Sequence, residues 1–149
     1  MDIGSGKGYP SSSLSNFSPH PFILDGVLCN SMEGFLQSTK YANFDMQKEI
    51  CLLVGKAAKF KGKKKKWFKE QILYWNGVEY PRKSKEYQDL LDRAFDALSE
   101  NETFKKALLA TGKSTLTHEI GKSKKSETVL TKSEFISRLY KIREKLQNE

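Results

Sequence analysis

The 149-residue chain has few of the residues that mark exported, membrane-bound or metal-binding proteins. No stretch approaches the roughly 20 apolar residues of a transmembrane helix, and the N-terminus lacks the apolar core of a secretory signal peptide. Two cysteines do not make a disulfide framework. Two cysteines and two histidines, all scattered, show no spacing that suits a metal site. We therefore expect a cytoplasmic protein with no membrane association, no metal ion and no other cofactor.

Several catalytic motifs are missing as well. No G-x-S-x-G turn or catalytic triad pattern is visible. Glycines surround Lys7 near the N-terminus, but the G-x-x-x-x-G-K-[ST] spacing of a P-loop is absent and no apolar strand precedes them. These absences argue against serine hydrolases of the α/β class and against P-loop nucleotide hydrolases.

Positive charge is abundant. The net charge is +8, with 26 Lys and Arg against 18 Asp and Glu, which favours anionic partners such as nucleotides, nucleic acid and phosphate esters. Eight lysines lie within residues 56–69. This run is either a solvated basic loop anchored by Trp67 and Phe68, or a patch that contacts phosphates while its aromatic residues stack on bases. The residues themselves leave both interpretations open.

The length and the 38% hydrophobic content predict a single domain over residues 1–149, with a Gly- and Ser-rich leader at 1–13 that is flexible or borders a pocket. Asp25-Gly26 and Asn76-Gly77 sit between apolar segments, which is typical of two-residue hairpin turns. We expect an α+β fold, mainly helical, with a small antiparallel sheet built from these hairpins.

Apolar residues at helical spacing predict five helices. The first two are expected at about 31–42 and 46–58. The others should begin at caps, namely Ser84, Asn101 and the capping box 131–134, with Gly112 ending the helix that Asn101 opens. Each carries an apolar stripe that we assign to the core.

Glu33, Gln37 and Lys40 fall on one face of the first expected helix. The adjoining arc is apolar or small and should face the core. An acid, an amide and a base would then project together, as a site for a small polar substrate requires. The alternative is structural, because Asn30 and Glu33 have the spacing of a capping box, in which Glu33 would only bind the helix end.

Three segments carry a resemblance to a known family. Residues 15–17 (S-N-F), Asp25-Gly26 and residues 31–41 resemble the N-terminal signature of the NADAR family, also called YbiA-like, which reads S-N-F, a hairpin glycine and E-x-x-x-Q-x-x-K-aromatic. Residues 58–63 are similar to its A-K-x-x-G-R segment, and 108–112 match L-L-A-T-G. The W-G-x-G motif expected after residue 116 is missing, and a Lys- and Ser-rich loop replaces it.

The resemblance implies roles for specific residues. Glu33 would act as general acid/base or as an electrostatic stabiliser, and Lys40 would attack the sugar as a nucleophile or contact ribose or phosphate, with Lys59 as second candidate. Other residues would bind substrate: Tyr9, Asn16, Phe17, Gln37, Lys59, Lys63 and His118. His118 or Glu119 could replace the acid of the missing motif. Trp67, Trp75 and Tyr87 compete for the place of the family's mid-chain tryptophan.

The resemblance further implies an N-glycosidase that cleaves the bond between ribose and a base. The lysine-rich segment favours removal of ADP-ribose from guanine in nucleic acid. The alternatives are hydrolysis of a small phosphoribosyl-aminopyrimidine of riboflavin synthesis, and a non-catalytic basic module that binds nucleotides or nucleic acid.

Overall fold

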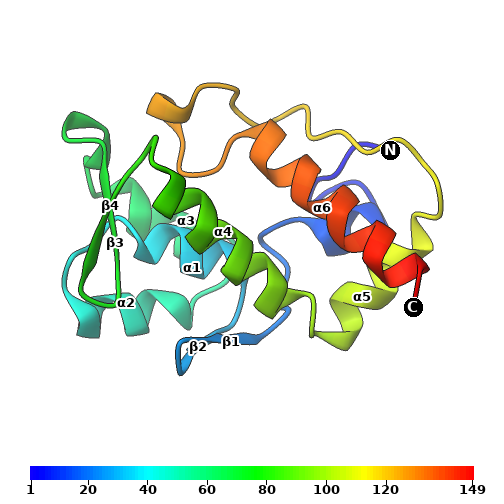
Figure 1. Cartoon of the computed structure of the whole chain (residues 1–149), viewed down its shortest axis with the longest axis horizontal. Helices are drawn as coiled ribbons and strands as arrows, with labels where there is room; N and C mark the ends of the chain where they lie inside the picture. Colours follow the sequence, from blue (N-terminus) through cyan, green and yellow to red (C-terminus); the bar gives the residue numbers. More distant parts are fainter.

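The computed structural model describes residues 1–149 as an α+β fold in which helices dominate (Figure 1). The α-helices are α1 (Met32–Ser38), α2 (Phe44–Cys51), α3 (Gly55–Lys63), α4 (Lys85–Leu98), α5 (Glu102–Ala110) and α6 (Lys132–Gln147). The strands are β1 (Phe22–Leu24), β2 (Val27–Cys29), β3 (Ile72–Trp75) and β4 (Val78–Pro81). Three short 3-10 helices complete the chain: η1 (Ser11–Leu14), η2 (Trp67–Lys69) and η3 (Lys125–Glu127). The expected fold class is confirmed.

Both hairpins form at the expected turns. Asp25 and Gly26 have φ of 51° and 78°, and Asn76 and Gly77 have φ of 50° and 83°, which is the left-handed backbone that a type I′ turn requires. The strands pair as β1–β2 and β3–β4, so there are two separate two-stranded sheets where we expected one small sheet. The indole nitrogen Nε1 of Trp75 donates to Oδ2 of Asp25 at 2.8 Å, so a side chain of β3 binds the turn of the other hairpin.

One hydrophobic cluster of 27 buried residues forms the core. Helix α4 supplies its expected stripe in full, with Tyr87, Leu90, Leu91, Ala94, Phe95 and Leu98 all buried. It packs against β1, β4 and α6. The caps at Ser84 and Asn101 and the capping box at Thr131 and Glu134 form as expected, and Gly112 follows α5 with φ of 59°.

The second expected helix is wrong as a single element. The segment 46–58 divides into α2 and α3, because Gly55 has φ of 53° and turns the chain between them. The first helix also ends early, at Ser38. The hydroxyls of Ser38 and Thr39 bond to carbonyls three residues back, and the Gln47 amide nitrogen binds the carbonyl of Ser38 at 3.3 Å. These side chains satisfy the carbonyls at the helix end, so α1 stops there.

The leader, which we expected to be flexible or to border a pocket, is packed against the rest of the chain. Ile3 is fully buried, and its backbone nitrogen donates to the carbonyl of Thr117 at 2.7 Å. Asp2 and Thr117 form a parallel bridge. Burial of one isoleucine side chain stabilises the folded state by roughly 2 kcal/mol. This contact places the leader beside the segment that links α5 to α6.

Candidate active site

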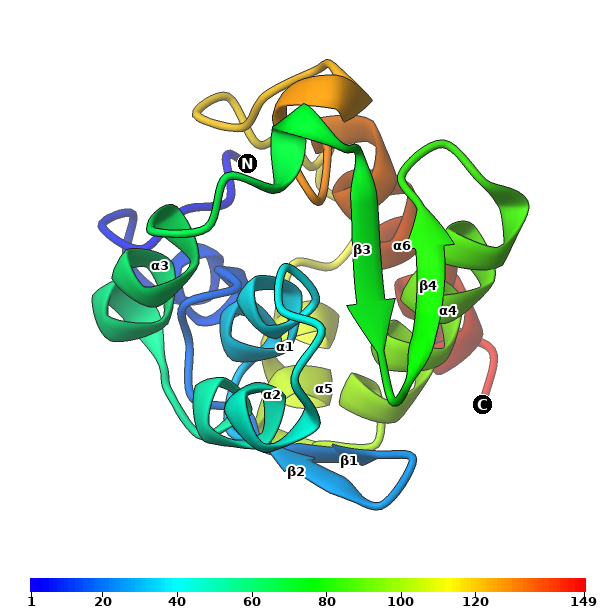
Figure 2. The same ribbon diagram turned by 90° about the vertical axis from the view of Figure 1, so that its left-hand side faces the viewer.

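A cavity of about 480 Å³ lies between α1, α3, the residues before β1 and the segment that links α5 to α6. Its volume is within the roughly 300–1,000 Å³ of pockets that hold small molecules and cofactors. In Figure 2, α3 and the orange turn near residue 125 lie at the end of the molecule that faces the viewer. Eight of the nine expected site residues line the cavity: Asn16, Phe17, Glu33, Gln37, Lys40, Lys59, Lys63 and His118.

The side chain of Glu33 belongs to the cavity and not to the helix end. Its Oε2 accepts a hydrogen bond from Nε2 of Gln37 at 2.7 Å. Ser31 caps α1, since its hydroxyl accepts from the backbone nitrogen of Gly34 at 3.0 Å. The capping-box interpretation of Asn30 and Glu33 is therefore wrong, and the carboxyl group is available to a ligand.

Close packing holds α1 in this place. A Cβ atom on Gly34 would lie 2.7 Å from the carbonyl oxygen of Leu53, so only glycine allows α1 to approach the end of α2 this closely. Ser31 also donates to that Leu53 oxygen at 3.0 Å. The backbone nitrogen of Glu33 donates to the carbonyl of Asn16 at 3.0 Å. This last bond ties the S-N-F segment directly to the residue with the carboxyl group.

Gly62 of α3 gives Gln37 its position. A Cβ on Gly62 would lie only 1.6 Å from Oε1 of Gln37, so the amide occupies the space that a side chain would fill. Oε1 is buried without a hydrogen-bond partner, while Nε2 points to Glu33. The contact with α3 therefore fixes the Gln37 amide beside the carboxyl group.

Lys40 reaches the cavity from beyond the end of α1, and not from the helix face that we expected. Its Nζ lies 3.4 Å from the carbonyl oxygen of Gly62. The hydroxyl of Tyr41 donates to the Lys61 carbonyl at 2.6 Å, and buried Gln47 donates to the Tyr41 carbonyl at 2.9 Å. These bonds hold the turn that carries Lys40, so the lysine remains beside α3.

Burial changes the protonation behaviour of both groups. Desolvation raises the pKa of Glu33 above its ordinary value, although the Gln37 hydrogen bond and the nearby charges of Lys40 and Lys59 act in the opposite direction. Desolvation lowers the pKa of Lys40, assisted by the charge of Lys122 and opposed by that of Glu33. An acid and a base are thus both displaced toward neutral pH, a pattern that occurs at catalytic sites.

The remaining expected residues form the walls. Lys59 and Lys63 are one turn apart on α3 and both line the cavity. His118 is held by two contacts: Nδ1 lies 2.8 Å from the carbonyl oxygen of Ile3, and its ring meets Phe135 edge-on at 5.0 Å between centroids. The leader therefore positions His118.

The lining residues that were not among the expected ones include Trp67, Lys122, Glu127 and Thr128. The three competing candidates for the family's tryptophan, Trp67, Trp75 and Tyr87, all belong to the core cluster, and Trp67 is the one that also lines the cavity. Glu127 supplies a second carboxyl group to the lining. No motif marks Lys122 or Glu127, because Lys122 begins the loop that replaces the missing W-G-x-G and Glu127 directly follows that loop.

Tyr9 is not brought to the cavity. Its side chain is 63% exposed, and Ser5 is the leader residue in the lining. Glu119 is exposed and outside the lining as well. His20 serves the fold, since its nitrogens lie 2.8 Å from the Thr103 hydroxyl and 2.6 Å from the Ser13 carbonyl.

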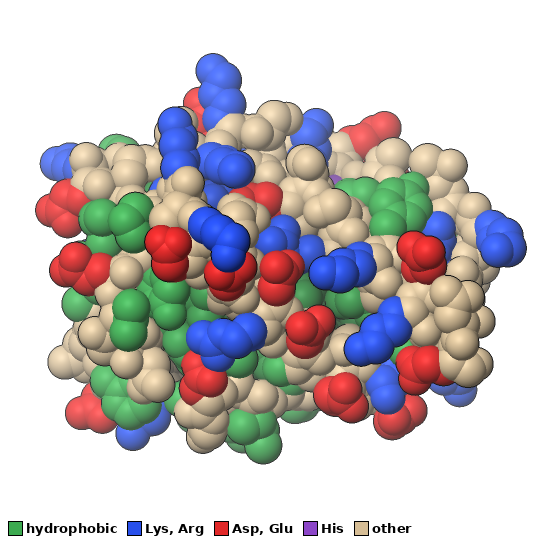
Figure 3. Space-filling view, viewed as in Figure 1, with side chains coloured by type: hydrophobic (Ala, Val, Ile, Leu, Met, Phe, Trp, Pro, Cys, Tyr) green, Lys and Arg blue, Asp and Glu red, His purple; other side chains and the backbone are tan.

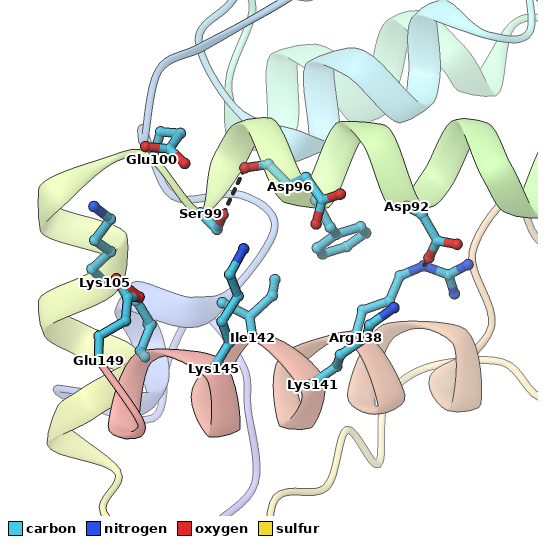
Figure 4. Close-up of a pocket in the computed structure, with 12 residues that line it drawn as sticks. Asp92, Asp96, Ser99, Glu100, Lys105, Arg138, Lys141, Ile142, Lys145 and Glu149 are labelled. Carbon is cyan, nitrogen blue, oxygen red and sulfur yellow. Dashed lines mark hydrogen bonds and ion pairs between the residues drawn. The ribbon is translucent and has the colours of Figure 1, made fainter.

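A second hollow of about 340 Å³ lies between α4 and α6 (Figure 4). Its acidic and basic side chains face one another across the groove, and Nε of Arg138 lies 3.0 Å from Oδ1 of Asp92. Figure 3 shows the same mixture of signs over this face of the molecule. None of the expected site residues lies there. We interpret this groove as a charged contact between helices.

Two kinds of feature are absent from the structure. No helix has both the length and the apolar character of a membrane span. No cluster of three or more His, Cys, Asp and Glu side chains is arranged to hold a metal ion.

Comparisons with known proteins agree with the α+β fold described above. The NMR structure of the E. coli protein YbiA shares the fold, with a TM-score of 0.63 at 17% identity over 99% of this chain and 84% of that one. The YbiA-like resemblance is thereby confirmed for the fold. An uncharacterized 17.1 kDa protein of the Gp30–rIII intergenic region of Enterobacteria phage T4 is 36% identical over 149 residues, which cover 98% of each chain. The model of the Bacteriophage protein GP30.3 family matches residues 8–144. The chain belongs to the Bacteriophage protein GP30.3 family.

Proposed function

We propose that this protein hydrolyses the N-glycosidic bond between a ribosyl group and a base. The observation that carries the proposal is the position of Glu33, whose carboxyl group lies in the cavity on a hydrogen bond from Gln37 and has a raised pKa. A carboxyl group whose pKa is moved toward neutrality can both give and accept a proton near pH 7.

The reaction needs a group that first gives a proton and later accepts one. The bond between C1′ of the ribose and the base nitrogen breaks, and the leaving base takes a proton from Glu33. The resulting carboxylate stabilises the positive charge that develops on the sugar. Water then adds to C1′ and returns a proton to Glu33. The products are the free base and a ribosyl group with a hydroxyl at C1′, and the carboxyl group ends as it began.

Lys40 provides a covalent version of the same chemistry. Because burial lowers its pKa, a neutral amine is available more readily than on an exposed lysine. Its Nζ attacks C1′, and the base leaves with a proton from Glu33. The Glu33 carboxylate then takes a proton from Nζ and passes it to the ring oxygen as the ribose opens to a Schiff base. Hydrolysis of this imine releases the sugar and restores the amine. Both routes use the Glu33 proton.

Lysines around the cavity favour a substrate with phosphates. Lys59, Lys63 and Lys122 reach the lining from two sides, and each can pair with a phosphate oxygen. An ADP-ribosyl group, with two phosphates between two riboses, suits a lysine-lined cavity of this size. The lysines outside the lining extend the positive charge and favour ADP-ribose on a guanine base of nucleic acid.

Product analysis with two substrates tests the proposal. The protein is incubated with single-stranded DNA that carries ADP-ribose on guanine, and separately with a phosphoribosyl-aminopyrimidine of the riboflavin pathway. We expect free ADP-ribose and unmodified DNA from the first. Turnover of only the second would favour the biosynthetic alternative. Tight binding of either without release of sugar would identify a non-catalytic module.

A further inference from the structure

A strip of unpaired positive charge adjoins the cavity. It follows α3 and η2 and carries Lys56, Lys59, Lys61, Lys63, Lys64, Lys65, Lys66 and Lys69. No acidic residue occurs between residues 50 and 69 of the chain, and no carboxylate lies within 4 Å of the Nζ of these lysines. The groove between α4 and α6 is the opposite case, because its acidic and basic side chains face one another. The strip therefore has no counter-charge of its own.

The positive surface continues on the other side of the cavity. Lys122 lines the cavity from the loop before η3, and Lys124 and Lys125 follow it as exposed residues. In Figure 2 the green segment after α3 runs toward the orange turn near residue 125, at the same end of the molecule. Lysines thus lie on two sides of the cavity that holds Glu33.

Two exposed phenylalanines accompany the lysine strip. Phe60 is 60% exposed and Phe68 is 53% exposed, and neither belongs to the hydrophobic core. Each directly follows a residue of the cavity lining, Lys59 in one case and Trp67 in the other. The Nζ of Lys63 lies 6.0 Å from the centre of the Phe60 ring. Exposed aromatic rings among unpaired lysines are the combination that binds single-stranded nucleic acid, in which lysines pair with phosphates and rings stack on bases.

We propose that a single strand of nucleic acid lies along this strip, with its phosphates on the lysines and with Phe60 and Phe68 stacked on bases next to the nucleotide in the cavity. The inference rests on the proposed function, of which it specifies the polymeric substrate. The strand must be single for two reasons. A ring can stack only on a base whose face is open, and Glu33 inside the cavity meets only a nucleotide that has left a duplex.

Binding of an unmodified oligonucleotide tests the inference without any turnover. The probes are a fluorescent single strand of about 12 nucleotides, the matching duplex, and vesicles with anionic lipid. We expect the single strand to bind more tightly than the duplex and the vesicles. The double variant Phe60→Ala/Phe68→Ala should weaken single-strand binding by about tenfold or more, since stacking contributes roughly 1–3 kcal/mol per base. Its salt dependence should remain unchanged.

Matched variants separate stacking from charge. Phe44→Ala is the aromatic control, because Phe44 is 40% exposed and has Lys48 4.9 Å from its ring centre but lies outside the strip and the lining. It should bind like the natural protein. Replacing Lys64, Lys65 and Lys66 by Gln should reduce the slope of log K against log salt by about 0.7 for each phosphate that the variant no longer neutralises. Circular dichroism and the melting temperature verify folding.

Several results would overturn the strand path. They are equal or tighter binding of the duplex, a preference for vesicles, or an effect of Phe44→Ala as large as that of the double variant. Release of ADP-ribose from a single ADP-ribosylated guanosine keeps the two proposals apart. The double variant should cleave this small substrate normally. If the natural protein fails to cleave it, the proposed function fails, while the oligonucleotide titration still decides the strand path.

Discussion

Gly62 and Gln37 are packed so closely that a single methyl group on the glycine would overlap the amide oxygen, at 1.6 Å. The same glycine presents its carbonyl to Lys40 at 3.4 Å. A residue without a side chain therefore contacts both Gln37 and Lys40, the two polar residues expected beside Glu33. Helix α3 therefore holds the side chains of Gln37 and Lys40 in position through its backbone.

Replacing Gly62 by Ala should displace the Gln37 amide from Glu33. Loss of a hydrogen bond to a charged group costs roughly 1.5–3 kcal/mol, so we expect kcat/KM to fall by about 10- to 100-fold. The basic limb of the pH profile, on which Glu33 loses its proton, should move to higher pH, because the Gln37 hydrogen bond is one of the contacts that lower the pKa of Glu33.

Gly6→Ala is the control for Gly62→Ala, since a Cβ on Gly6 meets nothing within 4 Å. It should change neither rate nor melting temperature. In a Gln37→Ala background, Gly62→Ala should cause little further loss. Full additivity of the two substitutions would contradict the coupling between glycine and amide.

Reduction with cyanoborohydride during turnover should attach the ribosyl group covalently to Lys40. The low pKa that burial gives this lysine favours its neutral form at neutral pH. Mass spectrometry of the digested protein locates the adduct, and Lys40→Arg should abolish it. An adduct at Lys59 would identify this residue of α3 as the nucleophile. The absence of any adduct would favour the direct attack of water.

Acid should destabilise the protein through Glu134. Burial raises the pKa of Glu134, but hydrogen bonds from Arg82 and Gln88 prevail and hold it at about 2. A carboxyl group whose pKa is lowered by folding stabilises the folded state above its unfolded value of about 4.3, and this stabilisation is lost as pH falls toward 2. Glu134→Gln also leaves Arg82 buried without its partner at 2.6 Å.

We expect Glu134→Gln to lower the free energy of unfolding at pH 7 by about 3 kcal/mol or more, a value typical of a broken buried ion pair. The difference from the natural protein should shrink between pH 4 and pH 2. Urea titrations across this range provide the measurement, with the exposed Glu86→Gln as control. A constant difference at all pH values would show that the Glu134 charge is not responsible.

Local chemistry explains why part of the fold was predictable. Asp25-Gly26 and Asn76-Gly77 encode their turns in two residues, and Ser84, Asn101 and Thr131 cap helices through bonds that span three residues. The break at Gly55 and the early end of α1 escaped prediction because they depend on distant partners. Gln47, for example, binds the carbonyl of Tyr74 at 2.8 Å as well as those at the end of α1.

The candidate site was also predictable only in part. Glu33, Gln37 and Lys40 were recognisable from a motif with fixed spacing, although Lys40 reaches the cavity from a turn and not from the helix. Glu127 was invisible in the sequence, because only the tertiary fold brings its loop across from α1. The resemblance implied that Tyr9 binds substrate, but Tyr9 is exposed and outside the cavity lining. A residue close to the S-N-F segment in sequence need not lie close to the cavity.

The most direct test of the account is the variant Glu33→Gln, measured for both turnover and stability. Its amide oxygen can still accept the hydrogen bond from Gln37, so the geometry of α1 should persist. An acid whose pKa is raised by folding costs stability as pH rises from its unfolded value through the folded one. The melting temperature of Glu33→Gln should therefore equal or exceed that of the natural protein at pH 7, and the difference should vanish below about pH 4.

Over the same samples, kcat for release of ADP-ribose should fall by at least about 100-fold, the contribution of a general acid/base. Loss of turnover with stability retained would support Glu33 as the catalytic carboxyl group. A markedly lower melting temperature with turnover intact would contradict the account and return Glu33 to a structural role.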